Sequence, residues 1–179
     1  MGAPQLTTVG HGTLEAGAFA SLVTAAGVDE VVDVRSFPGS RRHPHFRREQ
    51  MEQWLPAAGA GYRWEKALGG FRKARPGSVH VALRHAGFRG YADHMRTPEF
   101  RDALDRLVAG AGQRSVAVMC SESLWWRCHR RLLADALVMA CGADVRHLLH
   151  DGRCEPHRIT EGARPGDDGL PVYDVGVLL

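Results

Sequence analysis

Short apolar runs and amphipathic segments alternate along this chain, and that order constrains its fold more than any other feature. The apolar runs predict strands over residues 6–10, 30–34, 61–65, 115–119 and 143–149. Apolar residues at helical spacing predict helices over residues 13–26, 47–55, 97–110 and 126–141. A strand, a helix and a second strand within about 30 residues favour a right-handed βαβ unit with parallel strands. We therefore predict an α/β fold, a single domain with a mainly parallel sheet flanked by helices and with basic loops at the carboxyl ends of its strands.

The expected helix boundaries rest on local signals. Thr13 is expected to cap the first helix, and Pro56 is expected to stop the second. Thr97 followed by Pro98 is typical of a helix start, and Gly142 of a helix end. Between these elements, prolines and glycines predict irregular loops over residues 36–46 and 66–79.

The size and composition fit one compact domain. The chain has 179 residues, of which 44% are hydrophobic and 24% charged, and these values exclude a disordered or collagen-like chain. We expect one α/β domain over residues 1–150 and an irregular C-terminal tail over residues 151–179, which are rich in glycine, proline and charge. No run approaches the roughly 20 apolar residues that span a bilayer, and residues 1–10 lack a signal-peptide pattern. A cytoplasmic protein without membrane contact is therefore expected.

The cysteines and the charge distribution indicate what the chain binds. Four cysteines are too few for a disulfide scaffold, and the spacing of Cys120 and Cys128 matches no zinc knuckle. No metal site is predicted, although ligands from distant strands are geometrically allowed, and any cofactor and the oligomeric state stay open. Residues 35–75 hold ten Lys and Arg against three Glu, with Phe37, Phe46 and Phe71 among them. This pattern favours an anionic small molecule or a nucleic acid as partner, although an arginine excess also follows from codon bias.

Chemically useful side chains follow three of the predicted strands. Because ligands of parallel α/β sheets bind beyond the carboxyl ends of the strands, His11, Asp33, Arg35, Cys120 and Glu122 are expected at one edge. Asp33 and Arg35 lie two residues apart, share a face and can form one polar pair with His11. The alternative is that Asp33 and Arg35 only satisfy each other, and that His11 only bonds a neighbouring carbonyl.

The run from Met119 to Arg131 combines a strand end with a helix start. A thiolate of Cys120 at that point would have a lowered pKa and act as a nucleophile, whereas the alternative is a small buried hydrophobe. Glu122 could act as a general acid or base, or it could orient an arginine. The alternative is that its charge only complements the dipole in the first turn of the helix. Cys128, His129 and Arg130 are adjacent in a helix and spread over roughly 200° of its surface, so at most two reach a ligand.

Further basic side chains are expected to hold the anion. The pairs Arg41–Arg42 and Arg72–Lys73 lie in the two long loops, and Arg89 and Tyr91 precede a short helix. Ordinary loop packing is the alternative interpretation of the last two.

Several of these motifs together resemble a known family. They are T-V-G-H (8–11), V-D-V-R-S-F-P-G-S-R-R (32–42), L-G-G (68–70), F-R-G-Y-A-D-H-M (88–95), T-P-E-F (97–100) and M-C-S-E-x4-R-C-H-R-R (119–131). In this order they resemble the DUF488 family over about residues 6–150. The resemblance implies a cytoplasmic α/β domain but no established reaction. The positions that match its motifs are His11, Asp33, Arg35, Arg41, Arg42, Arg89, Tyr91, Cys120, Glu122, Arg127, Cys128, His129 and Arg130.

The sequence departs from that family in two places. The first motif reads G-H-G where many relatives resemble G-H-S, which puts a hydroxyl contact at Gly12 in doubt. The segment after Asp151 has no counterpart.

From these residues we predict an enzyme of unknown reaction that acts on an anionic, nucleotide-like or nucleic-acid substrate. Cys120, Glu122, His11 and Asp33 are its expected catalytic residues. The expected substrate-binding residues are Arg35, Arg41, Arg42, Arg89, Tyr91, Arg127, Cys128, His129 and Arg130. The alternatives are a non-catalytic nucleic-acid binding module and a rhodanese-like sulfur carrier with a persulfide on Cys120.

Overall fold

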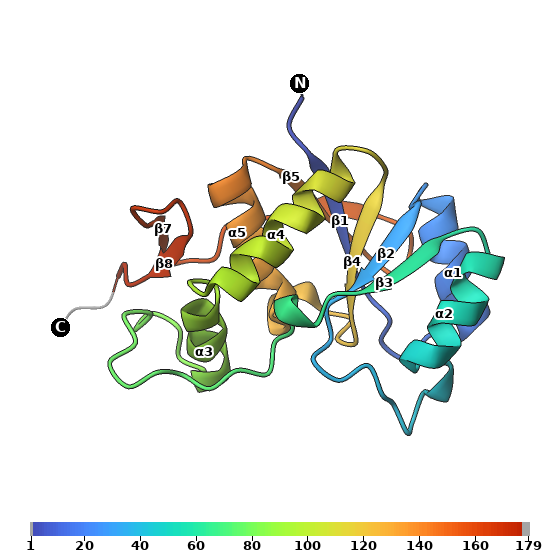
Figure 1. The fold of residues 1–179 in the computed structure, drawn as a ribbon, viewed down its shortest axis with the longest axis horizontal. Coiled ribbons are helices and arrows are strands. Elements are labelled where there is room, and N and C mark those ends of the chain that lie inside the picture. The colour runs from blue at the N-terminus through green and yellow to red at the C-terminus, as the bar shows by residue number, and fades with distance from the viewer. Residues whose placement is uncertain (1, 177–179) are drawn as a thin grey trace.

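The computed structural model describes residues 2–176, and a six-stranded sheet crosses its middle (Figure 1). The strands are β1 (Gln5–Gly10), β2 (Glu30–Asp33), β3 (Gly61–Trp64), β4 (Val116–Cys120), β5 (Asp144–Leu148) and β6 (Cys154–Pro156). Their order in the sheet is β3-β2-β4-β1-β5-β6. The first five strands are mutually parallel, and β6 pairs antiparallel with β5. The predicted α/β fold with a mainly parallel sheet is confirmed.

Helices cover both faces of this sheet. They are α1 (Ala16–Ala25), α2 (Arg48–Ala57), α3 (Ala86–His94), α4 (Pro98–Ala111) and α5 (Arg130–Cys141). In Figure 1, α1 and α2 lie together at one side, and α3, α4 and α5 at the other. Two separate apolar clusters fill the space between helices and sheet, so the strands are buried on both faces.

The alternation of side chains along β4 decides which cluster each residue joins. Ala117 and Met119 pack in the cluster under α1 and α2, whereas Val118 and Cys120 pack in the cluster under α3, α4 and α5. Gly10 at the end of β1 pairs with Cys120 at the end of β4. The carboxyl ends of β1, β2 and β4 therefore meet at one edge, with the Cys120 side chain turned toward α5.

The first two helices have boundaries that differ from the predicted ones. Helix α1 begins at Ala16 after Glu15, and Thr13 does not cap it, because the chain makes a turn after Gly12 first. Pro56 lies inside the last turn of α2, where burial of Met51 and Leu55 holds the helix although one backbone bond is lost.

Helices α5 and α3 also begin at other residues than predicted. Residues 125–127 form a separate 3-10 turn, η3 (Trp125–Arg127), so α5 starts only at Arg130. Helix α3 contains Arg89 and Tyr91, which were expected to precede it. By contrast, Thr97 caps α4 as expected, because its hydroxyl accepts a hydrogen bond from the backbone N–H of Phe100.

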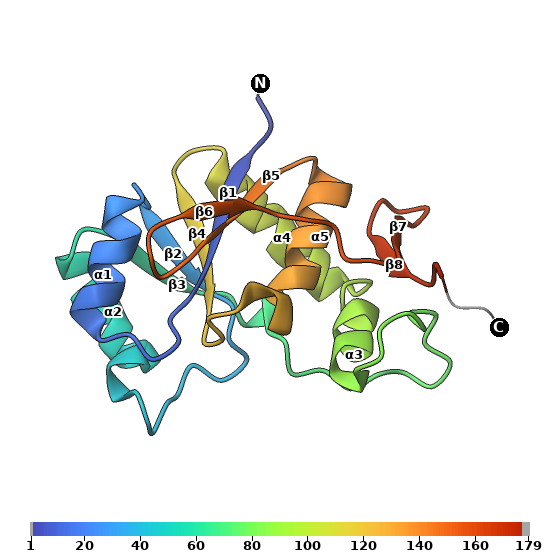
Figure 2. The ribbon, with the colours of Figure 1, turned by 180° about the vertical axis from the view of Figure 1, so that it is seen from behind.

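The segment after Asp151 is more ordered than its composition predicts. It forms β6 and a two-stranded ribbon, β7 (Ala163–Pro165) with β8 (Pro171–Tyr173). Figure 2 shows it running from β6, at the edge of the main sheet, past α5 to the ribbon above α3. Leu170 and Tyr173 are buried in the apolar cluster under the helices, and all of β8 is buried. The expectation of an irregular tail is wrong for these strands, because a few buried apolar residues suffice to dock a short ribbon.

None of the helices within residues 2–176 combines the length and the apolar character that crossing a membrane requires.

Candidate functional site

Two adjoining pockets lie at the carboxyl ends of β1, β2 and β4. One pocket, of about 300 Å³, has both Cys120 and Cys128 in its wall, and we call it the thiol pocket. The other, of about 370 Å³, has His11 in its wall, and we call it the histidine pocket. Both are lined by Arg35, Phe37, Ser121 and Glu122. The structure thus brings together the edge residues that the sequence placed there.

A pair of buried thiols forms one wall of the thiol pocket. Cys120 is the last residue of β4, and Cys128 follows η3 just before α5. Their Sγ atoms are 2.7 Å apart, a hydrogen-bonding contact between two free cysteines. The short loop between strand and helix folds back on itself and sets the two sulfurs side by side.

Arg130 lies beneath this pair and is only 1% exposed. Its Nε donates to the Sγ of Cys120 at 3.0 Å, and its Nη2 donates to the carbonyl of Glu122. Its Nη1 donates to the Oγ1 of Thr8 at 3.3 Å. Within residues 2–176 no carboxylate forms an ion pair with this guanidinium. The sulfurs are therefore its nearest partners able to carry negative charge.

The environment favours one shared thiolate. Burial opposes ionisation of Cys128, but the hydrogen bond from Cys120 and the charges of His129 and Arg130 outweigh it and lower the pKa of Cys128 well below 9.0. Burial and the adjacent Cys128 raise the pKa of Cys120 well above that value. Because two anions cannot lie in contact, the pair takes at most one charge, and the opposite pKa shifts place it on Cys128.

His129 supports Cys128 from the side of β2. Its Nε2 donates to the carbonyl oxygen of Val34 at 3.2 Å, and its Nδ1 lies 3.5 Å from the Sγ of Cys128, where an N–H donates to a thiolate. The ring also packs edge-on against Tyr91 at 5.1 Å. Cys128 and His129 line the thiol pocket, whereas Arg130 does not. The expectation that these three residues share a helix is wrong, because the short turn η3 delays the start of α5 to Arg130.

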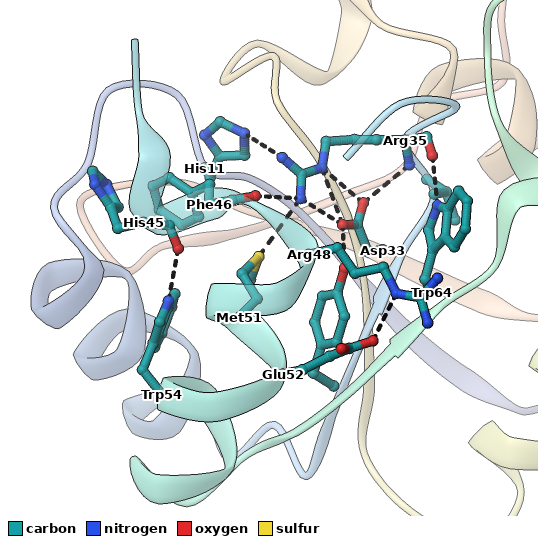
Figure 3. A network of polar contacts seen from close by, with 12 residues as sticks. His11, Asp33, Arg35, His45, Phe46, Arg48, Met51, Glu52, Trp54 and Trp64 are labelled. Atoms are coloured by element: carbon teal, nitrogen blue, oxygen red, sulfur yellow. Dashed lines mark hydrogen bonds and ion pairs between the residues drawn. The ribbon is translucent and has the colours of Figure 1, made fainter. Parts of the chain in front are cut away.

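Arg35 forms a second buried network, shown in Figure 3. Its Nε and Nη2 donate to both oxygens of Asp33, at 2.6 to 3.1 Å. Its Nη2 also donates to the carbonyl of Phe46 at 2.7 Å, and its Nη1 lies 3.4 Å from Nε2 of His11. The predicted polar pair of Asp33 and Arg35 with His11 is confirmed.

His11 is held in place by its neighbours. Its Nδ1 donates to the carbonyl of Gly12 at 2.9 Å, and its ring stacks on Phe46 at 4.1 Å. Burial and the adjacent Arg35 lower the pKa of His11 to about 3, so the ring is neutral. Neutral and hydrogen-bonded at both nitrogens, His11 orients Arg35 at the wall of the histidine pocket.

The two glycines beside His11 permit this close packing. A Cβ on Gly10 would lie 1.9 Å from the carbonyl oxygen of Glu122 and 2.8 Å from Nη2 of Arg130. Gly12 has a φ of 53°, and a Cβ there would lie 2.6 Å from the Oγ of Ser123. A serine at Gly12 would thus meet Ser123 directly, which accounts for glycine at this position.

A chain of buried polar groups continues behind Arg130. The Oγ1 of Thr8, which accepts from Arg130, lies 2.7 Å from Nδ1 of His147. Nε2 of His147 lies 3.0 Å from Nδ1 of His157, and Nε2 of His157 lies 2.8 Å from the Oδ1 of Asp135. With both rings neutral, every donor points toward the Asp135 carboxylate. Burial, above all, and the charge of Arg130 lower the pKa of His147 to about 3, which agrees with a neutral ring.

The outer walls of the pockets are basic and aromatic. Phe37 is 72% exposed and Phe71 is 83% exposed, with ring centroids 6.1 Å apart. Arg72 and Arg127 line the thiol pocket, and Arg42 lines the histidine pocket. Glu122 is the single carboxylate among the residues of either wall, and its Oε1 accepts from the backbone N–H of Leu124.

Besides Arg130, four predicted site residues do not line these pockets. Asp33 is fully buried beneath Arg35, and Arg41 is exposed outside the walls. Arg89 donates to the carbonyls of Leu83 and Arg84, and the buried Tyr91 donates to the carbonyl of Leu68. Arg89 and Tyr91 thus support the loops, and Asp33 supports Arg35.

Sequence reasoning missed the groups behind Arg130. Thr8, Asp135, His147 and His157 lie on four separate segments, and only the fold brings them together. A polar residue within an apolar strand or helix, such as Thr8 or Asp135, is the one local signal that could have pointed to them. No group of three or more His, Cys, Asp or Glu among residues 2–176 is arranged to hold a metal ion.

Comparison with known proteins gives one match. No curated protein and no solved structure resembles the chain significantly. The family model described as a domain of unknown function, DUF488, matches residues 15–137. The match includes the thiols, Arg35 and Arg130 but begins after His11. Because it covers well over half of the chain, this protein belongs to the DUF488 family.

Proposed function

We propose that the protein is an enzyme that uses a thiolate shared by Cys120 and Cys128 on an anionic, nucleotide-like substrate. The observation that carries this proposal is the contact between Arg130 and Cys120, at 3.0 Å, in a place where no carboxylate of residues 2–176 pairs with Arg130. A buried guanidinium without a counter-charge costs several kcal/mol, so a negative charge on the thiol pair is favoured, carried by Cys128 in contact with Cys120. The charge that balances Arg130 is then also the nucleophile.

Cys128 is the attacking sulfur of the pair. It is the more exposed of the two thiols, at 7% against 2% for Cys120. The pKa of Cys128 is also the lowered one, because its hydrogen bonds and the nearby charges outweigh the effect of burial. Cys120 donates its proton into the contact and keeps the charge on its neighbour. This assignment exchanges the roles that the strand-end position of Cys120 suggests.

The walls of the thiol pocket suit a flat anion. Arg127 and Arg72 place positive charge at the pocket, and Phe37 and Phe71 offer exposed ring faces. Guanidinium groups bind phosphate oxygens, and aromatic rings stack on bases. Arg35 contributes to the wall, although Asp33 and Phe46 already occupy most of its N–H groups.

The simplest reaction is a two-step substitution. The lone pair of the Cys128 thiolate forms a bond to an electrophilic atom of the substrate, and the leaving group departs with its bonding electrons. Water then attacks that atom, Glu122 accepts the water's proton, and the electron pair of the broken bond returns to sulfur. Glu122 finally passes the proton to the leaving group, which restores the starting enzyme.

Alkylation of the thiols tests this proposal without knowledge of the substrate. In a Cys141→Ser and Cys154→Ser background, iodoacetamide should label one sulfur at neutral pH, and adenosine monophosphate or inorganic phosphate should slow the labelling. Cys128→Ser should abolish that reaction, because it removes the ionised sulfur. Labelling that begins only as the pH approaches the ordinary thiol value, or that neither anion slows, would contradict the proposal.

A sulfur carrier is the second candidate, because the site presents two thiols in contact. The thiolate would attack the outer sulfur of thiosulfate, forming a persulfide and releasing sulfite with the bonding electrons. Incubation with thiosulfate should then yield one sulfite per chain and a protein heavier by one sulfur atom. A protein of unchanged mass and no sulfite would exclude this candidate.

A further inference from the structure

The ion pairs of the arginines divide the surface into two parts. Several exposed arginines of the sheet flanks pair with acids, such as Arg48 with Glu52 and Arg164 with Asp174. Apart from Arg35, which pairs with Asp33, the arginines that line the thiol pocket, the histidine pocket and a third pocket behave differently. Among residues 2–176, no carboxylate pairs with Arg42, Arg72, Arg84, Arg127, Arg131 or Arg158. Arg41, Arg47, Arg75 and Arg89 are likewise without an ion pair in this part of the chain but lie outside these three pockets. Their charge is available to a partner.

Three of these arginines belong to a third and larger pocket. This pocket has a volume of about 860 Å³. Three segments bound it, namely the turn η3, the loop before α3 and the chain after β6. We call it the tail pocket. Arg84, Arg131 and Arg158 line it, with Glu161 as its single acid. The chain beyond Asp151 supplies one wall, through residues 158–162 together with Val175 and Gly176.

The tail pocket combines these charges with aromatic rings. Trp126 is 45% exposed, and Trp125 and Phe88 are half-buried in the same wall. The guanidinium of Arg131 lies over the Phe88 ring at 5.2 Å. Rings that alternate with unpaired guanidinium groups are the pattern that stacks on bases and neutralises phosphates.

Buried polar atoms in this wall lack partners within the protein. Nε1 of Trp125, Nε of Arg131 and Oγ1 of Thr160 are buried without a hydrogen bond to any described residue. All three residues line the tail pocket. Two of these groups are N–H donors, which suit an acceptor such as a phosphate or a base carbonyl.

The three pockets form a continuous series. The thiol pocket shares Arg35, Phe37, Ser121 and Glu122 with the histidine pocket, and it shares His85 and Phe88 with the tail pocket. Unpaired arginines occur in all three, and the thiol pair lies in the middle one. A mononucleotide fills only one of them, whereas a polymer with regularly spaced phosphates and bases matches the series.

We infer that the tail pocket is a second binding subsite for single-stranded nucleic acid, which runs along the three pockets and places one nucleotide at the thiols. The inference rests on the proposed function and names its substrate class. A single strand fits better than a duplex, because only unpaired bases expose their faces to Phe37, Phe71 and Trp126.

Fluorescence anisotropy with labelled oligothymidine and oligouridine of about 12 nucleotides tests the inference. Both should bind at low salt, and their affinity should fall as salt rises. Trp126→Ala should weaken binding about fivefold or more, the effect of losing one stacked base. Arg158→Glu should weaken it as well and reduce the salt slope by at least about 0.7. Arg114→Glu, the same charge change beside Glu30 and away from the pockets, should leave binding nearly unchanged.

The outcomes separate this inference from the proposed function. Equal affinities of Trp126→Ala, Arg158→Glu and Arg114→Glu would overturn the tail pocket as a subsite, and so would a duplex that binds as well as the single strand. Binding to anionic vesicles without binding to either oligonucleotide would overturn it in favour of a membrane surface. In each case alkylation of the thiols and its inhibition by adenosine monophosphate still test the proposed function on their own. Arg114→Glu, which lies outside the pockets, should keep the wild-type alkylation rate.

Discussion

The protein buries two arginines at the carboxyl edge of its sheet, and they are balanced in different ways. Arg35 is 6% exposed and forms a bidentate ion pair with Asp33, which itself accepts a further hydrogen bond from Tyr62. Arg130 is 1% exposed and meets one sulfur, a hydroxyl and two backbone carbonyls. The first network is complete within the protein, whereas the second is complete only when a thiol ionises.

This difference separates support from chemistry. A guanidinium that pairs with a carboxylate is neutralised, so it has little electrostatic effect on other groups, and its hydrogen bonds hold the surrounding loops in place. A guanidinium without one lowers the free energy of any anion placed beside it, which here is a thiolate in the wall of a pocket. Under the proposed function, Asp33 and His11 therefore support the site, and Cys128 carries its chemistry.

The largest expected effect comes from removing the carboxylate that pairs with Arg35, so that Arg35, like Arg130, has no carboxylate partner among residues 2–176. Asp33→Asn removes the counter-charge and leaves the guanidinium buried, which should lower the free energy of unfolding by about 3–5 kcal/mol. Urea denaturation measures this change, with Asp151→Asn on the exposed Asp151–Arg153 pair as a control that should cost less than about 1 kcal/mol. A similar small loss in both variants would mean that Arg35 does not depend on Asp33.

Each arginine network also contains a buried neutral histidine, and acid should destabilise both. The pKa values of His11 and His147 are lowered from 6.5 to about 3. Between these values the unfolded chain binds protons that the folded chain does not, so stability falls as the pH falls through this range. Each histidine contributes up to about 1.4 kcal/mol per pH unit.

Denaturation at a series of pH values checks this contribution. Replacement of one histidine at a time, His11→Gln or His147→Gln, should make the pH dependence shallower in each case. Slopes equal to that of the wild type would show that the replaced ring is protonated in the folded protein.

Removal of Arg130 should change the thiols more than the fold. Arg130→Met keeps most of the side-chain volume but removes the charge beside Cys120, so the pKa of the thiol pair should rise. Alkylation at neutral pH should then slow about tenfold or more, the equivalent of one pKa unit. Arg131→Met, one residue further on and without a contact to either sulfur, is the matched control. Equal alkylation rates in the two variants would show that Arg130 does not stabilise the thiolate.

The smallest effect is expected at the far end of the polar chain behind Arg130. His157→Gln interrupts the link from Asp135 to His147 and should raise the pKa of the thiol pair by a few tenths of a unit, because Thr8 then orients Arg130 less firmly. The pH profile of alkylation measures the shift. A profile identical to that of the wild type would limit His157 to holding β6 in place.

The sequence predicted the sheet and the edge of the site, because both depend on local patterns. Continuous apolar runs identified β1 and β4 to within one residue, and the rule for parallel sheets brought His11, Arg35 and Cys120 to one edge. The pairing of Asp33 with Arg35 followed from their spacing along one strand direction.

The parts that were not predicted depend on contacts between distant segments. A turn between β4 and α5 that folds Cys128 back onto Cys120 has no signature in spacing, because eight residues permit many loop shapes. The strands beyond Asp151 are only three residues long and are stabilised by docking rather than by propensity. The polar chain from Thr8 to Asp135 joins four segments, so no local pattern reveals it.

Ultraviolet titration of the thiolate in the Cys141→Ser, Cys154→Ser background tests the central claim most directly. One thiolate per chain should already be present at neutral pH, because Arg130 and the second sulfur hold the pKa of Cys128 well below 9.0. The signal should be lost in Cys128→Ser. A protein that shows no thiolate until the pH approaches 9.0 would contradict the claim that Arg130 is balanced by an ionised cysteine.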